Sequence, residues 1–249
     1  MSRRTPRPAP NAPSSAGADQ VRQVWFILFV GAALFGIQHI AFYADDYIFL
    51  DAARRMPVDS VLLGQHGIYP WYRPLSREIY FYGALLAGPY GRLFTIAVSA
   101  LTAGMAAWCL YRIGGELGSK SGGALASTLF LTHSLTRFLT AWASGFQDLL
   151  SACLVLWAVY AELRGRSRLA LGLAVLAPFA KETGIIAFPL LYLAERQQSK
   201  TWPSLKSVLR LAAAALAVVL IHLLVRSTWL TGGSSLVIRT SAEVGEVNR

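Results

Sequence analysis

Charged residues are scarce in this chain. Only 14% of its 249 residues are Asp, Glu, Lys or Arg, whereas 55% are hydrophobic, and the mean hydropathy is +0.46. Soluble domains carry about 25% charged residues, so the composition excludes an ordinary soluble domain and predicts a membrane protein. Cysteine is scarce too: Cys109 and Cys153 both fall inside apolar runs, which predicts small packed side chains rather than a disulfide framework.

Acidic residues are fewer than basic residues. The chain has 13 Asp and Glu against 23 Lys and Arg, a formal net charge of +10. Such an excess can attract nucleic acid, but here the basic residues lie in short clusters between apolar runs, as in the loops of membrane proteins. We therefore expect a lipid bilayer, and no nucleic acid, as the partner of the basic residues.

Apolar runs close to the length of a membrane span recur along the chain. A bilayer core needs about 20 apolar residues per helix. Runs of about this length occur at 24–43, 92–111, 122–140, 147–163 and 207–225. The pattern predicts an all-α, polytopic membrane helical bundle.

The segment 169–194 is ambiguous, because Lys181 and Glu182 interrupt it at its centre. As one helix it would bury both charges in mid-membrane, and as two helices each half is short for a crossing. Arginines precede it at 164–168, and Arg196 and Lys200 follow it. Since basic flanks prefer the cytoplasm, we expect two short helices with Lys181 and Glu182 at the outer surface.

This choice gives about seven spans and three regions. Residues 1–23, rich in Pro, Ala, Ser and Arg, are expected to form a disordered cytoplasmic tail. Residues 24–229 form the transmembrane module, with a first outer loop at 44–90, and 230–249 form a short outer tail. Apolar spacing predicts amphipathic interfacial helices at 48–56 and 79–86. Composition favours a bacterial inner membrane protein with a cytoplasmic N-terminus.

Asp45 and Asp46 follow the first apolar run directly, where carboxylates are costly to desolvate. Neighbours in sequence cannot both point into one pocket from a regular helix. Either one of them acts as a general base towards an acceptor hydroxyl, or the pair caps the helix that follows. The sequence leaves both interpretations open.

Further polar residues fall on the same outer side of the expected bundle. Arg73 and Arg77 could bind a lipid phosphate bidentately or touch anionic head groups. Lys181 could neutralise a leaving phosphate that Glu182 orients, or the two could lock helices together. Gln147 and Asp148, which open the fourth long apolar run, are counted with these residues as candidate contacts to the substrate and the donor phosphate. Three histidines, His66, His133 and His222, are not at the spacing of metal ligands, so packed roles are expected for them.

The order of these motifs resembles the GT-C glycosyltransferases, and most closely the protein O-mannosyltransferase and tetratricopeptide-containing mannosyltransferase branch with its bacterial relatives. The resemblance covers roughly residues 24–225. It rests on Ala44-Asp45-Asp46-Tyr47, Tyr72-Arg73-Pro74-Leu75, the stretch Trp142 to Leu150, and Ala180-Lys181-Glu182-Thr183-Gly184-Ile185. Each motif is short, and the specificity lies in their order.

The resemblance implies a fold and a reaction. GT-C enzymes share a module of about seven membrane helices and transfer a sugar from a polyprenyl-phosphate donor to a protein, lipid or glycan acceptor on the outer face. It places the catalytic carboxylate at Asp45 or Asp46, and donor-phosphate contacts at Arg73, Arg77 and Lys181. Some members use a divalent metal, although this sequence shows no metal cage, so no cofactor is assigned.

One departure leaves alternatives open. Family members usually continue into further helices, whereas this sequence ends about twenty residues after its last apolar run. A compact enzyme, a truncated product and half of a split protein all fit. The rival functions are a non-catalytic GT-C-like protein that binds lipid or a partner and, with less support, a secondary transporter.

Overall fold

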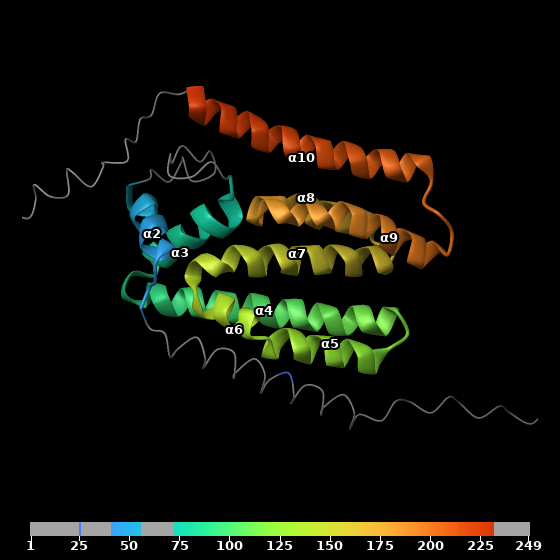
Figure 1. Ribbon diagram of the computed structural model, residues 1–249, viewed down its shortest axis with the longest axis horizontal. Helices are drawn as coiled ribbons and strands as arrows, with labels where there is room; N and C mark the ends of the chain where they lie inside the picture. The colour runs from blue at the N-terminus through green and yellow to red at the C-terminus, as the bar shows by residue number, and fades with distance from the viewer. Residues whose placement is uncertain (1–24, 26–40, 56–71, 232–249) are drawn as a thin grey trace, which may run out of the picture.

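The computed structural model describes residue 25 and residues 41–55 and 72–231, and these ranges contain helices and no strand (Figure 1). Short elements come first: α2 (Asp45–Arg55), the π-helical turn η2 (Pro74–Glu78), α3 (Ile79–Leu86) and η3 (Gly88–Tyr90). The longer helices follow, namely α4 (Gly91–Glu116), α5 (Lys120–Thr132), α6 (Ser134–Ala141), α7 (Phe146–Leu163), α8 (Ser167–Ala180), α9 (Ala187–Ser199) and α10 (Leu205–Thr231). Two short turns, η4 (Ala143–Gly145) and η5 (Glu182–Ile186), join them.

Three stretches are long and apolar enough to cross a membrane: Gly88–Glu116, Ala143–Leu163 and Leu205–Ser227. They contain α4, α7 and α10 and match the runs predicted at 92–111, 147–163 and 207–225. The helical fold class is therefore confirmed, and these three segments are candidate membrane spans by their length and composition. The predicted span at 24–43 lies mostly outside the described residues, and the tail at 1–23 and residues 232–249 lie entirely outside them.

The segment 169–194 forms two helices, as its flanking charges predicted. Helix α8 ends at Ala180, Lys181 adopts an extended conformation, and α9 begins at Ala187. The chain reverses here, because Gln198 at the end of α9 lies beside Gly165, which precedes α8. Gly184 allows the tight turn: a Cβ there would lie 2.4 Å from the carbonyl carbon of Ala177.

The run at 122–140 is not one continuous helix. It divides at His133, whose backbone is extended between α5 and α6 and whose Nδ1 accepts a hydrogen bond from Leu135 N. The imidazole therefore caps α6, and the expectation of a single helical run over these residues was wrong. Helices α2 and α3 occur where interfacial helices were predicted, at 48–56 and 79–86, and their place at the membrane interface stays a prediction.

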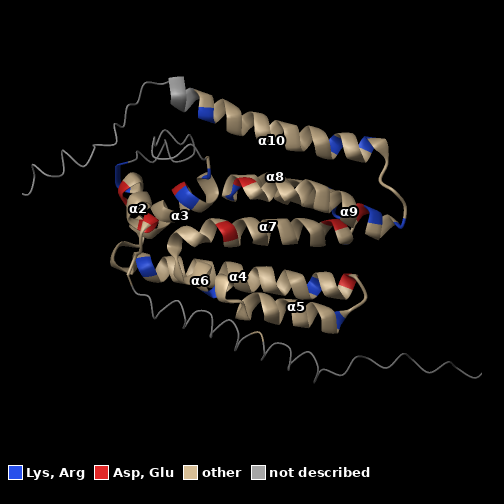
Figure 2. Ribbon diagram, viewed as in Figure 1, with Lys and Arg blue, Asp and Glu red and all other residues tan. Residues whose placement is uncertain are grey.

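The long helices are arranged so that their charges gather at two ends, with apolar stretches between (Figure 2). One end, which we call the basic end, comprises the ends of α4, α7 and α9 and the starts of α5, α8 and α10. Arg164 contacts Glu116 there, and Ser207 donates a hydrogen bond to Glu195. The basic end carries Arg112, Lys120, Arg164, Arg166, Arg168, Arg196, Lys200, Lys206 and Arg210, against Glu116, Glu162 and Glu195.

Small residues let the helices pack closely. Ala158, Ala170, Ala174, Ala177 and Ala187 are fully buried where α7, α8 and α9 meet. Helix α4 packs against α5 and α7, and its residues Ala103, Ala106 and Ala107 are fully buried. Close helix packing through small side chains is typical of proteins in lipid, where helices gain little from burying leucine. Helix α10 packs on this core through the buried side chains of Leu211 and Val218, and its other faces keep many exposed leucines.

Candidate functional site

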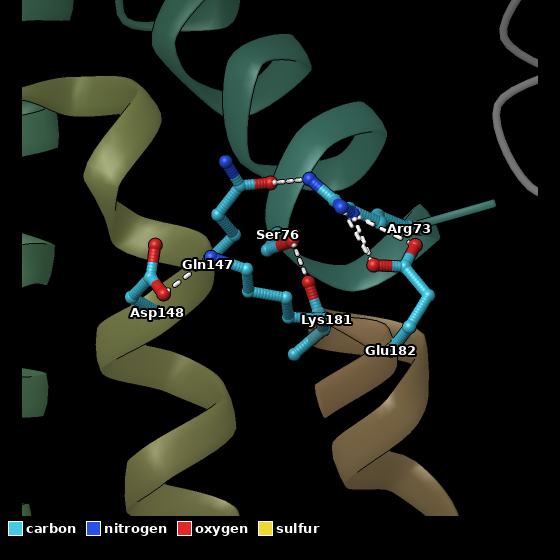
Figure 3. A network of polar contacts seen from close by, with 7 residues as sticks. Arg73, Ser76, Gln147, Asp148, Lys181 and Glu182 are labelled. Atoms are coloured by element: carbon cyan, nitrogen blue, oxygen red, sulfur yellow. Dashed lines mark hydrogen bonds and ion pairs between the residues drawn. The ribbon is translucent and has the colours of Figure 1, made fainter. Parts of the chain in front are cut away.

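The opposite end of the bundle, which we call the network end, holds nearly all the residues singled out from the sequence. It comprises α2, η2, the starts of α4 and α7, and the turn between α8 and α9. Its centre is a set of polar contacts among Arg73, Gln147, Asp148, Lys181 and Glu182, which we call the polar network (Figure 3).

Arg73 is the hub of the polar network. Its Nε donates to Glu182 Oε1 and Oε2 at 2.9 and 3.0 Å, and its Nη2 donates to Oε2 at 2.6 Å. Its Nη1 donates to Gln147 Oε1 at 2.5 Å. The guanidinium is mostly buried, with 15% of the side chain exposed, so these charge-assisted bonds are only weakly screened. One arginine thus joins η2, α7 and η5.

A second ion pair lies beside the first. Lys181 Nζ contacts Asp148 Oδ1 at 2.5 Å, and both side chains are partly exposed. On α7, Asp148 therefore contacts the turn directly through Lys181, whereas Gln147 reaches it through Arg73, which binds Glu182 (Figure 3). Lys181 and Glu182 pair with other elements and not with each other, so the two charges do lock helices together, but through Asp148 and Arg73.

Ser76 fixes the position of η2 relative to this turn. Its Oγ donates to the carbonyl oxygen of Ala180 at 2.5 Å, and the side chain is buried. That carbonyl belongs to the last turn of α8, where intrahelical donors run out. The hydroxyl therefore satisfies a helix end and holds Arg73 at the level of Glu182. Ser76 was not singled out from the sequence, because a lone serine three residues after an arginine carries no signal.

The two acidic neighbours have different environments. Asp46 is fully buried: its Oδ1 accepts from Ser144 N at 2.7 Å and Ser144 Oγ at 2.5 Å, and its Oδ2 accepts from Tyr43 N at 3.0 Å. Asp46 thus fastens the start of α2 to the turn before α7. It caps the backbone that precedes it, not the backbone that follows, which corrects the capping interpretation.

Asp45 is exposed, and its carboxylate makes no hydrogen bond or ion pair within the described ranges. It lies at the network end, because its neighbour Asp46 touches Ser144, and Ser144 precedes Gln147 by three residues. That spacing is about one helical turn. Of the two carboxylates, Asp45 is the one available to a substrate.

Arg77 does not join the polar network. It is buried, lies with its guanidinium 5.8 Å from the centre of the Phe49 ring, and donates from Nε to Glu78 Oε1 at 2.6 Å. Glu78 is also buried, and its Oε2 has no hydrogen-bond partner among the described residues. Burial raises the pKa of Glu78, against the opposing effect of Arg77. The phosphate-binding role of Arg77 stays a prediction, and its Nε is already occupied by Glu78.

One residue near the network was not expected to contribute. The His222 ring stacks on Phe179 with centroids 5.1 Å apart and meets Tyr72 edge-on at 5.8 Å. Its Nε2 is buried without a hydrogen-bond partner among the described residues. This contact joins α10 to α8 beside Arg73. A packed role was predicted for His222, because a single histidine in an apolar run usually packs as part of a core, but its place beside the polar network was not predicted.

Within the described part of the chain, no three His, Cys, Asp or Glu side chains converge as a metal site would require. Asp148 and Glu182 are each taken up by a cation, so this donor set does not fit a divalent ion. Comparison with family models, curated proteins and solved structures found no match for the chain. Over the described residues, fold and site together define an all-helical bundle with three helices long and apolar enough to cross a membrane and a polar site at one end.

Proposed function

We propose that the protein is a membrane glycosyltransferase that moves a sugar from a polyprenyl-phosphate donor to an acceptor hydroxyl. The observation that carries this proposal is the guanidinium of Arg73, held beside Lys181 at the same end as the exposed carboxylate of Asp45. Arginine binds carboxylate and phosphate with the same planar fork. A lipid phosphate can therefore take the place of the Glu182 carboxylate on Arg73, with Lys181 as the second positive charge.

The reaction we propose is a direct displacement. Asp45 accepts the proton of the acceptor hydroxyl, and the hydroxyl oxygen forms a bond to the anomeric carbon. The bond from that carbon to the phosphate oxygen breaks, and the electron pair leaves on polyprenyl phosphate, which Arg73 and Lys181 stabilise. The stereochemistry at the anomeric carbon inverts. No step is assigned to a metal.

The charges favour one orientation. We propose about seven spans, made of the first apolar run, α4, the α5–α6 pair, α7, α8, α9 and α10. The basic end carries nine Lys and Arg against three Glu, and such an excess is typical of the cytoplasmic side. The polar network then lies at the outer face of a bacterial inner membrane. This is the face at which GT-C enzymes use polyprenyl-phosphate sugars as donors.

A specific observation favours a second candidate. The ionic groups of the polar network pair with one another, two positive against two negative. A closed network of this kind is what a purely structural clamp between η2, α7 and η5 would also need. The second candidate is therefore a non-catalytic relative that binds lipid or a protein partner.

Sugar transfer tests the proposal directly. Membranes carrying the wild-type chain are incubated with radiolabelled polyprenyl-phosphate sugars, and released or transferred sugar is counted. We expect turnover by the wild type and a loss of about 100-fold or more in Asp45→Asn, as for removal of a general base. Turnover that is equal in Asp45→Asn and wild type would rule out Asp45 as the base.

Asp46→Asn is the matched control. An amide at position 46 cannot keep all three accepted hydrogen bonds, and each buried donor left unpaired costs roughly 1–3 kcal/mol. We expect a lower thermal midpoint for this variant and a midpoint close to wild type for Asp45→Asn. No turnover by a folded wild-type chain with any donor would favour the non-catalytic candidate.

A further inference from the structure

An apolar groove of about 840 Å³ lies between the α5–α6 pair and α7, over α4. Its outer part is lined by Asp148 and Thr183, and its deeper part by Leu110, Ala126, Val155 and Leu156. Helices α5 and α7 both pack on α4. The groove is the space left between them, and it begins beside the polar network.

The depth of the groove suits one leaflet of a bilayer. Asp148 lies in the first turn of α7 and Leu156 eight residues further along, which corresponds to about 12 Å of helix. Half of a hydrocarbon core is about 15 Å. Leu129, Leu135 and Ile186 line the groove and are 59%, 55% and 54% exposed, so the groove opens sideways towards the surroundings of the bundle. A hydrocarbon chain can enter it from the outer leaflet.

The polar lining of the groove distinguishes between head groups. It consists of the Asp148 carboxylate, the hydroxyls of Thr136, Ser151 and Thr183, and the imidazole of His133. No lysine or arginine lines it. A phosphate there would meet the ion pair of Asp148 and Lys181, which carries no net charge, so the charge of the phosphate would stay uncompensated in a site of low dielectric. Hydroxyl groups, in contrast, can donate to Asp148 and exchange hydrogen bonds with the threonines.

We propose that this groove binds a lipid with an uncharged, hydroxyl-bearing head group, with a hydrocarbon chain along α7 and the hydroxyl at Asp148 and Thr183. In a sugar-transfer reaction this lipid is the acceptor, and that role alone rests on the proposed function. The two substrates then bind on either side of Lys181: the phosphate of the donor binds on the side of Arg73, and the hydroxyl of the acceptor binds on the side of Asp148.

A matched pair of photoactivatable lipids tests the proposal. Diacylglycerol and phosphatidic acid with identical acyl chains, each carrying a diazirine, are added to the purified full chain in phosphatidylcholine nanodiscs. Cross-linked peptides are then identified by mass spectrometry. We expect diacylglycerol to label residues 129–139 and 148–156 at least fivefold more than phosphatidic acid. Equal or stronger labelling by phosphatidic acid would overturn the assignment of the head group.

Variants that fill the groove test the site itself. Ala152→Phe and Ala126→Phe, both in the lining, should each reduce diacylglycerol labelling about fivefold or more. Ala126 is exposed, so its variant keeps the test valid if Ala152→Phe does not fold. Ala213→Phe, on the exposed face of α10, is the control and should label as the wild type does. Labelling unchanged by both lining variants would contradict the proposal.

The binding measurement is independent of turnover. Groove labelling without sugar transfer would refute the glycosyltransferase and leave the lipid site in place. Sugar transfer by a chain whose groove is not labelled would refute the lipid site and leave the glycosyltransferase in place.

Discussion

At the residue scale, the decisive distinction is between charges that hold the fold and charges that stay available. Asp46 and Arg77 are buried and bonded within the chain, whereas Asp45 is exposed. The sequence predicted the pair of aspartates but could not separate them, because the separation depends on Ser144, which is 98 residues away. Contacts at this range are set by how the helices pack, and short motifs do not encode them.

Glu78 gives a residue-scale prediction about pH. Burial raises the pKa of its carboxyl above the ordinary 4.5, so the folded chain binds more protons than the unfolded chain above about pH 4.5. This group therefore stabilises the fold less as pH rises. We expect the thermal midpoint of Glu78→Gln, minus that of wild type, to increase between pH 5 and pH 8. Scanning fluorimetry in detergent measures it, and a difference independent of pH would contradict the account.

At the element scale, the apolar runs predicted α4, α7 and α10 because length and hydropathy alone define a spanning helix. The break between α8 and α9 was predicted from flanking arginines, since these place both outer ends of the segment on one side. The break at His133 was not predicted, because no proline or glycine marks it and the residue caps α6 through its side chain. Residues 147–148 and 181–182 were predicted to lie on the same side of the membrane. The contacts that join them, from Asp148 to Lys181 and from Gln147 through Arg73 to Glu182, were not predicted.

The α8–η5 turn yields an element-scale prediction. A methyl group on Gly184 would lie 2.4 Å from the backbone of Ala177, so Gly184→Ala must push η5 away from α8 and move Lys181 and Glu182. We expect a clear loss of thermal stability, comparable to overpacking a core at about 1–3 kcal/mol. Gly172→Ala, in the same α8 with nothing within 4 Å, is the control and should be neutral or slightly stabilising. Equal midpoints for the two variants would show that the turn does not pack as described.

At the scale of the whole molecule, the segregation of charge into a basic end and a network end sets the proposed orientation. Single cysteines test it in a chain whose buried Cys109 and Cys153 are replaced by alanine. We expect a membrane-impermeant maleimide to label Asp51→Cys on α2 in intact cells. Ser121→Cys, at the start of α5, should react only after permeabilisation. The reverse pattern would place the polar network in the cytoplasm and remove it from the outer-face substrates proposed here.

The central claim is that the polar network is a binding site as well as a brace between helices. Exchanging its two main charges in Arg73→Glu/Glu182→Arg keeps an ion pair of the same two residue types but removes the cation from its place beside Lys181 and Gln147. The account predicts a thermal midpoint within a few degrees of wild type, together with loss of turnover of polyprenyl-phosphate sugars. Turnover that recovers together with stability in this double variant would contradict it, and the network would then be a clamp alone.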